Sequence, residues 1–131
     1  MKVIISSGKR KTAIARATLK PGKGVVRINK ALLAQYHPQM LQQKIQEPLL
    51  IAGAVAGKVD IKVNVNGGGI SSQAEAARLA IGRALVQFDK SLEKDLLAYD
   101  RHLLVADIRR KETTKPNRRG RARAKRQKSY R

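Results

Sequence analysis

Charge is distributed unevenly along this chain of 131 residues, and the distribution limits which segments can fold into a core. Residues 1–46 carry ten Lys and Arg and no Asp or Glu, whereas residues 47–107 carry seven basic and eight acidic side chains. Residues 108–131 carry twelve basic side chains and a single acidic one, Glu112. Because like charges repel one another and resist burial, the core has to come from the residues before this last segment.

This partition predicts one folded domain over residues 1–108 and an extended Arg/Lys-rich tail over residues 109–131, disordered in isolation. The net charge of +20 requires a polyanionic partner, which would be nucleic acid, an anionic membrane or an acidic protein. The absence of cysteine excludes disulfides and thiolate metal sites. No apolar run approaches the roughly 20 residues of a membrane span, and no signal region precedes the first strand pattern. We therefore expect a soluble, intracellular protein without a membrane partner.

Alternation of apolar and polar residues predicts strands at residues 3–6, 12–20, 25–28 and 59–66. A break is expected at Ser7 and Gly8, and the turn-forming residues 21–24 predict a hairpin over residues 11–29. Alanines at positions 13, 15 and 17 share one face of their strand. Such small side chains predict that a helix packs closely there.

Two helices are predicted in the first half of the chain. Asn29 is expected to cap a short helix over residues 31–35, and a second helix is expected over residues 39–46 with Met40, Leu41 and Ile45 on its apolar face. Pro48 should end or bend that helix, although the apolar residues after it fit a buried continuation.

The second half of the chain predicts two more helices. Ser72 and Glu75 have capping-box spacing before a long amphipathic helix that ends near Phe88. Ser91 is expected to cap a shorter helix that ends at Tyr99, and the apolar residues 103–105 should dock on the body. The order of elements predicts an α+β fold, a two-layer sandwich with helices over one face of a mostly antiparallel sheet.

Catalytic chemistry is not indicated. The two histidines, His37 and His102, do not have the spacing of metal ligands, and the acidic residues form no pair suited to acid–base catalysis. Asp100 and Asp107 lie near arginines, where structural salt bridges are expected. The sequence therefore predicts a protein that is not an enzyme and has no metal, cofactor or small-molecule substrate.

A glycine triplet between a predicted strand and a predicted helix has the general layout of a phosphate-binding loop. The candidate phosphate contacts are Gly67, Gly68, Gly69 and Ser71. The lysine of a true P-loop is missing, which favours a tight strand-to-helix reversal over phosphate binding. If a phosphate does bind here, a nucleic-acid backbone fits better than a nucleotide.

The basic segments carry the strongest functional signal, and RNA is the expected ligand. Candidate RNA contacts in the domain are Lys9, Arg10, Lys11, Arg16 and Lys23, and Lys20, Arg27 and Lys30 belong to the same basic stretch. Arginine dominates the tail, and its planar fork suits phosphates better than lysine does. Candidate contacts in the tail are Arg109, Arg110, Lys111, Arg118, Arg119, Arg121, Arg123, Lys125 and Arg126. A solvated charged face and a solubility tail are the plainer alternatives.

Five stretches in this order resemble the family of small-subunit ribosomal protein nine. They are residues 8–17, the turn at 21–24 followed by Asn29, the glycine triplet with residues 73–78, residues 107–112, and the ending at 127–131. The resemblance covers essentially the whole chain. The Lys-Ser-Tyr-Arg ending is similar to the archaeal and eukaryotic branch, and an archaeal source is expected.

The resemblance implies a two-layer α/β sandwich with a left-handed β-α-β crossover, a fold shared with a family of small-molecule kinases. It also implies a structural role in the small ribosomal subunit, in the cytoplasm. The partners would be rRNA of the 3′ major domain in the subunit head, neighbouring head proteins and the anticodon stem-loop of P-site tRNA. The residues nearest that tRNA would be Lys128, Ser129, Tyr130 and Arg131.

Two rival functions and one departure qualify this interpretation. A kinase is disfavoured because the kinase family's catalytic residues have no counterpart here. A chromatin-like DNA-compacting protein would account for the charge but not for the ordered motifs. Residues 113–117 depart from the lysine- and glycine-rich stretch of the family, which leaves the path of the tail between Glu112 and Gly120 open.

Overall fold

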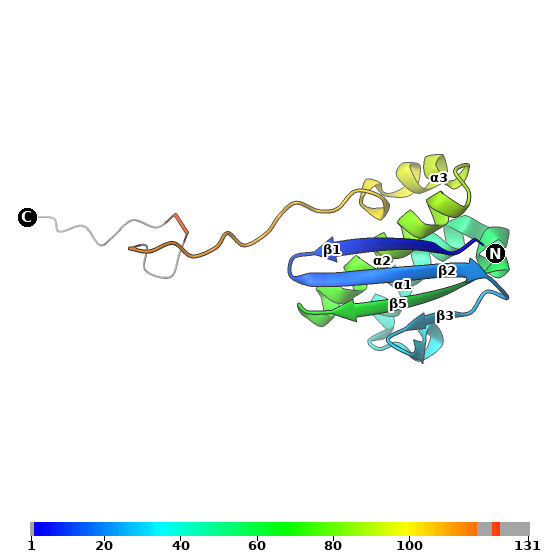
Figure 1. The fold of residues 1–131 in the computed structure, drawn as a ribbon, viewed down its shortest axis with the longest axis horizontal. Coiled ribbons are helices and arrows are strands. Elements are labelled where there is room, and N and C mark those ends of the chain that lie inside the picture. Colours follow the sequence, from blue (N-terminus) through cyan, green and yellow to red (C-terminus); the bar gives the residue numbers. More distant parts are fainter. Residues whose placement is uncertain (1, 118–121, 124–131) are drawn as a thin grey trace, which may run out of the picture.

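The computed structural model describes residues 2–117 and 122–123 (Figure 1). The strands are β1 (Ile4–Arg10), β2 (Ala13–Pro21), β3 (Val26–Ile28), β4 (Ala31–Leu32) and β5 (Val59–Asn66). The α-helices are α1 (Gln39–Ala52), α2 (Ile70–Phe88) and α3 (Leu92–Tyr99), and short 3-10 helices cover Leu33–Gln35, Gly53–Lys58 and Arg101–Leu103. No helix in this described part of the chain is both long and apolar enough to cross a membrane.

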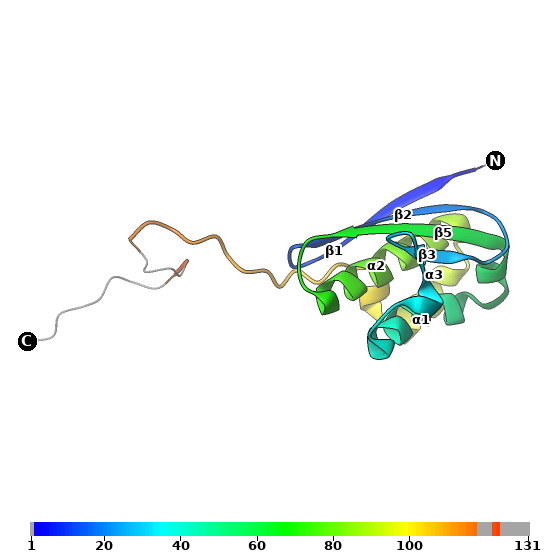
Figure 2. The ribbon, with the colours of Figure 1, turned by 90° about the horizontal axis from the view of Figure 1, so that it is seen from below.

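The strands form one sheet in the order β1-β2-β5-β3-β4. All pairings are antiparallel except the one between β3 and β5. Helices α1 and α2 pack on one face of the sheet, α3 packs against them, and the other face is left open (Figure 2). This arrangement confirms the predicted α+β fold with its helices on one side of a mostly antiparallel sheet.

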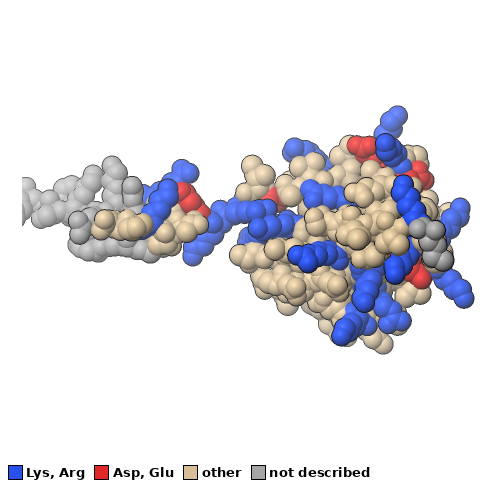
Figure 3. Space-filling view, viewed as in Figure 1, with Lys and Arg blue, Asp and Glu red and all other residues tan. Residues whose placement is uncertain are grey.

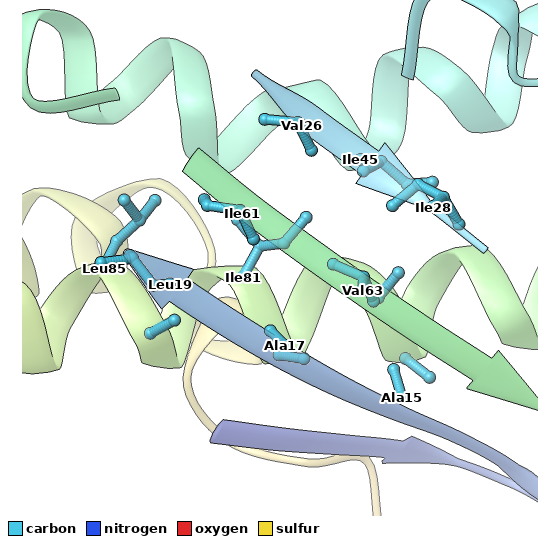
Figure 4. Close-up of a cluster of buried hydrophobic side chains, with 14 of the residues drawn as sticks. Ala15, Ala17, Leu19, Val26, Ile28, Ile45, Ile61, Val63, Ile81 and Leu85 are labelled. Carbon is cyan, nitrogen blue, oxygen red and sulfur yellow. The ribbon is translucent and has the colours of Figure 1, made fainter. Parts of the chain in front are cut away.

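The core lies between the sheet and the two longer helices (Figure 4). Leu19 and Ile61 face Ile81 and Leu85 of α2, and all four side chains are almost completely buried. Burying one such side chain stabilises the fold by about 1.5–3 kcal/mol. The inward residues of each strand thus fix which side of the sheet the helices cover.

Small residues on β1 and β2 let α2 approach the sheet closely. The alanines at positions 13, 15 and 17 are fully buried, as the close-packing prediction requires. On β1, a Cβ added at Gly8 would lie 2.4 Å from the carbonyl oxygen of Ala76 and 2.8 Å from the amide nitrogen of Ala80, both in α2. The break expected at Ser7 and Gly8 is therefore wrong, because this glycine serves helix packing and β1 continues to Arg10.

The predicted hairpin over residues 11–29 is also wrong. β5 lies between β2 and β3, pairing antiparallel with β2 and parallel with β3. The turn after β2 instead crosses the start of β5, where the Asp60 carboxylate accepts hydrogen bonds from the backbone N–H groups of Lys23, Gly24 and Val25. The residues of β5 alternate regularly between buried and outward positions, so this strand can offer an apolar face to the core while it pairs along both edges.

Three helix predictions need correction. Residues 31–35 form β4 and a 3-10 turn in place of a capped helix. Asn29 has a φ of 49°, and its side chain exchanges two hydrogen bonds with the Val65 backbone, which ties β3 to β5. Helix α1 runs through the buried Pro48 to Ala52, so the continuation is confirmed, but Met40 is 71% exposed and does not belong to the apolar face.

The expected caps of the later helices are absent among the described residues. Helix α2 begins at Ile70, two residues before Ser72, and no side chain caps it. Helix α3 has the predicted extent, but the Ser91 hydroxyl donates to the Asp89 carboxylate and does not cap the helix. Leu103 is fully buried against α2 and Leu104 is partly buried, but Val105 is exposed, so the expected docking of residues 103–105 is confirmed only for the first two. Beyond them, residues 109–117 contain no helix or strand and lead away from the sandwich (Figure 1).

Candidate nucleic-acid interface

The open face of the sheet carries four exposed cations from its three central strands. Strand alternation turns Arg16 and Lys20 of β2, Arg27 of β3 and Lys62 of β5 away from the helices. We call these four residues the basic sheet face. Lys62 has Thr18 and Arg27 as its register partners, and Arg16 is paired with Asn64. Figure 3 shows Lys and Arg spread over this face, with acidic residues mostly at its margin.

These four cations make no ion pair with any carboxylate in the described part of the chain. Asp60 lies opposite Lys20, but one of its oxygens accepts three backbone N–H groups at 2.9–3.1 Å. Hydrogen bonds from Val25 and Lys23 outweigh the small cost of burial and lower the pKa of the Asp60 carboxyl. Asp60 thus stays ionised, but it supplies one negative charge against four cations, so the face keeps a net positive field that is available to an external anion.

Two shallow hollows lie on this face. One, of about 500 Å³, is lined by Thr18, Lys20, Arg27 and Lys62 among others, and a second of about 200 Å³ is lined by Ile14, Arg16, Asn64 and Asn66. Both hollows combine cations with neutral hydrogen-bonding groups, and the Asp60 carboxylate also lines the larger one. The cations and the neutral groups supply the chemistry that phosphate and sugar oxygens require.

The β1–β2 turn and the glycine triplet, which the sequence singled out separately, lie together at one end of the sheet. Gly67 and Gly68 have φ values of 77° and 67°, and a Cβ on either would lie within 3 Å of Thr12 or Ala13. The Gln73 side chain closes the loop by donating to the Gly67 carbonyl at 3.0 Å. These contacts account for the glycines as a tight strand-to-helix reversal. Gly69 and Ser71 are exposed beside it, and phosphate contact by this loop stays a prediction.

The three basic residues at the end of β1 and in the β1–β2 turn have different environments. Lys11 is exposed, Lys9 is partly buried, and neither makes an ion pair within the described residues. Arg10 is largely buried, with its guanidinium 2.6 Å from Glu75 and 3.6 Å from Asp107. Lys23 is exposed in the turn after β2. Of the predicted RNA contacts in the domain, Arg10 is therefore the one whose charge is already paired with carboxylates of the same chain.

A charged cluster joins the helices to the base of the tail around a cavity of about 340 Å³. Arg78 of α2 binds Glu47 of α1 and, at 3.1 Å, Asp100 at the end of α3. Asp107 accepts from Arg109 at 2.7 Å, and hydrogen bonds from the Arg109 side chain and backbone lower the pKa of its carboxyl. The predicted structural salt bridges of Asp100 and Asp107 are thus confirmed.

The tail residues after this cluster are described only in part. Arg110 and Lys111 are exposed, and Glu112 pairs with Lys115 at 2.9 Å and with Arg123 at 2.7 Å. The other predicted RNA and tRNA contacts lie outside the described residues: Arg118, Arg119, Arg121, Lys125, Arg126, Lys128, Ser129, Tyr130 and Arg131.

Sequence reasoning missed Lys62 and the cluster around Arg78. Alternation over residues 59–66 had already placed Lys62 on the polar side of its strand, but the neighbours of that strand were not known. Arg78 and its two partners are 22 and 31 residues apart in the chain, so no local pattern joins them. His102 donates its backbone N–H to Asp100, and no group of three His, Cys, Asp or Glu suited to a metal occurs among the described residues.

Comparisons with known proteins identify the family of this chain. The family model described as Ribosomal protein S9/S16 matches residues 8–131. The small ribosomal subunit protein uS9 of Methanococcus maripaludis strain C7 is 48% identical over 134 residues, with all of both chains covered. The protein of the same name from Methanococcus vannielii is also 48% identical over the full length of both chains. The chain therefore belongs to the ribosomal protein S9/S16 family.

Proposed function

We propose that this protein is a structural constituent of the small ribosomal subunit and binds rRNA in support of translation. The observation that carries the proposal is the basic sheet face, whose four cations have no carboxylate partner in the described part of the chain. Unpaired cations on a rigid sheet bind a polyanion with little reorganisation, and they release its condensed counterions. The family is one of ribosomal proteins and not of enzymes.

The location within the subunit rests on the family resemblance. We propose that the protein docks on rRNA of the 3′ major domain in the subunit head, beside other head proteins, and acts in the cytoplasm. Its contacts with that rRNA would come from the basic sheet face and from the end of the sheet that carries Lys9, Lys11 and the glycine triplet. The left-handed sense of the β3-α1-β5 crossover also stays an expectation from the resemblance.

Sedimentation of the full-length chain in a cell extract tests the proposal. At low salt the protein should migrate with small subunits, and it should remain there until salt is high enough to strip ribosomal proteins. A variant carrying Arg16→Gln and Lys62→Gln should leave the subunit at lower salt than a control carrying Lys90→Gln and Lys94→Gln, two exposed lysines near α3. Migration as free protein or with DNA at low salt would refute the ribosomal role.

The end of the tail supports a second, finer proposal. Residues 128–131 would approach the anticodon stem-loop of P-site tRNA, where Arg131 offers a guanidinium to a phosphate and Tyr130 stacks or donates a hydrogen bond. A chain that ends at Gln127 should assemble into subunits almost normally, while those subunits should lose P-site tRNA faster in a filter-binding assay. Unchanged tRNA retention in truncated subunits would exclude this contact.

A further inference from the structure

The neutral side chains on the open sheet face are as informative as its cations. Thr18, Asn64 and Asn66 lie between or beside the members of the basic sheet face, and each supplies a hydroxyl or an amide. Aromatic residues are absent from all five strands of the described part; Tyr36 follows a 3-10 turn, while Phe88 and Tyr99 end α2 and α3. The face therefore offers charge and hydrogen bonds but no ring surface.

Sheets that bind single-stranded RNA stack unpaired bases on aromatic side chains of their strands, and this face has none to offer. An RNA duplex presents different chemistry. Its bases are already stacked on one another, and its wide, shallow minor groove displays 2′-hydroxyls between two rows of phosphates. Cations interleaved with hydroxyls and amides match that pattern, because the cations meet phosphates while the neutral groups exchange hydrogen bonds with 2′-hydroxyls.

The face is also held rigidly, as recognition of shape requires. Its side chains project from β2, β5 and β3, and in β5 both edges are hydrogen-bonded to neighbouring strands. Asp60 fixes the turn before β3 through three backbone N–H groups, and Asn29 fixes the end of β3 to Val65 of β5. The spacing of the backbone positions from which the cations project is thus set before any RNA binds.

We propose that the basic sheet face, with Thr18 and Asn64, docks on the backbone of double-helical RNA and recognises it by phosphate spacing and 2′-hydroxyls. The inference rests on the proposed function, because it names the form of RNA that the rRNA-binding surface takes. Base identity does not enter this recognition. The tail adds affinity for any nucleic acid, so the duplex preference belongs to the sheet.

The test measures binding of the full-length chain to three fluorescent probes of one sequence and length, near 16 nucleotides per strand. The probes are an RNA duplex, one of its single strands without self-complementarity, and the corresponding DNA duplex. At moderate salt, where tail binding is screened, the RNA duplex should bind about tenfold more tightly than either of the others. Equal affinity for single-stranded RNA or for duplex DNA would overturn the inference.

Two double variants locate the preference on the sheet. Arg16→Gln with Lys62→Gln should weaken duplex RNA binding and lower the salt slope by roughly 1.8, at about 0.9 per phosphate contact. Thr18→Val with Asn64→Ala leaves the charge unchanged, so it should remove the preference for RNA over DNA duplex and leave the salt slope as it was. Lys90→Gln with Lys94→Gln is the matched control and should bind like the parent chain.

The outcomes separate this inference from the proposed function. If both sheet variants keep the preference for duplex RNA, that preference does not come from the sheet face. The inference then fails, even if the protein still sediments with small subunits. If the chain fails to sediment with small subunits but keeps a sheet-dependent preference for duplex RNA, the inference stands and the ribosomal role fails. Circular dichroism of each variant verifies that the domain remains folded.

Discussion

A chain that ends at Ile108 is expected to bind small-subunit rRNA two to three orders of magnitude more weakly than the full-length chain at low salt. Residues 109–131 hold twelve of the 29 Lys and Arg. If only six of those cations meet phosphates, the slope of log affinity against log salt falls by roughly 5, at about 0.9 per contact. This is the largest effect on RNA binding that we expect from any single change in the chain.

Filter binding of purified rRNA across a salt series measures both the affinity and the slope. The matched control keeps residues 1–108 and joins them to a tail of the same composition in permuted order. It should recover most of the low-salt affinity, because that term depends on charge, but it should assemble poorly if the native tail follows a defined path through rRNA. A truncated chain with unchanged slope and normal incorporation into subunits would contradict both parts.

Replacing Arg78 by methionine is expected to lower the free energy of unfolding by about 3 kcal/mol, because two carboxylates then lose their partner in a partly buried site. The Arg78 side chain is 13% exposed, and Glu47 and Asp100 bind it from α1 and from the end of α3. Its loss therefore weakens the contact of α2 with two other helices at once. Urea denaturation followed by circular dichroism measures the change.

Two further variants separate charge from packing. Arg101→Met makes the same substitution at an exposed residue beside Asp100, outside the ion pairs described, and should change stability by less than about 0.5 kcal/mol. Adding Glu47→Gln and Asp100→Asn to Arg78→Met should restore part of the loss, because no unpaired charge is left behind. Equal stability of the Arg78 and Arg101 single variants would show that the cluster does not stabilise the fold.

The unfolding measurements on the Arg78 and Arg101 variants should be made at neutral pH. At Asp100, partial burial is outweighed by the His102 backbone hydrogen bond and the Arg78 guanidinium, so the pKa of this carboxyl is lowered. A lowered folded pKa contributes stability above the unfolded pKa of about 3.9, and that contribution is lost as the pH falls through the lower folded value. Near pH 7 the carboxylate is fully ionised, and the ion pair contributes in full.

Local sequence information was sufficient for the position of the core along the chain and for the faces of its strands. The segregation of charge placed the core before residue 109, and period-two alternation identified the buried sides of β2 and β5. The alanines of β2 correctly predicted that a helix packs closely against this strand. Each of these features depends on residues within a few positions of one another, so it can be read along the chain.

Pairing between distant segments was decided only by the tertiary structure. Alternation shows which way a side chain points but not which strand lies beside it. The insertion of β5 between β2 and β3 placed Lys62 between Thr18 of β2 and Arg27 of β3. For the same reason, the sequence identified Arg10 as a candidate RNA contact but could not show that its guanidinium forms ion pairs with Glu75 and Asp107. The sequence by itself predicted that the protein binds a polyanion. The fold decided which cations are free to do so, because folding brings some of them into ion pairs with carboxylates and leaves others exposed on the open face of the sheet.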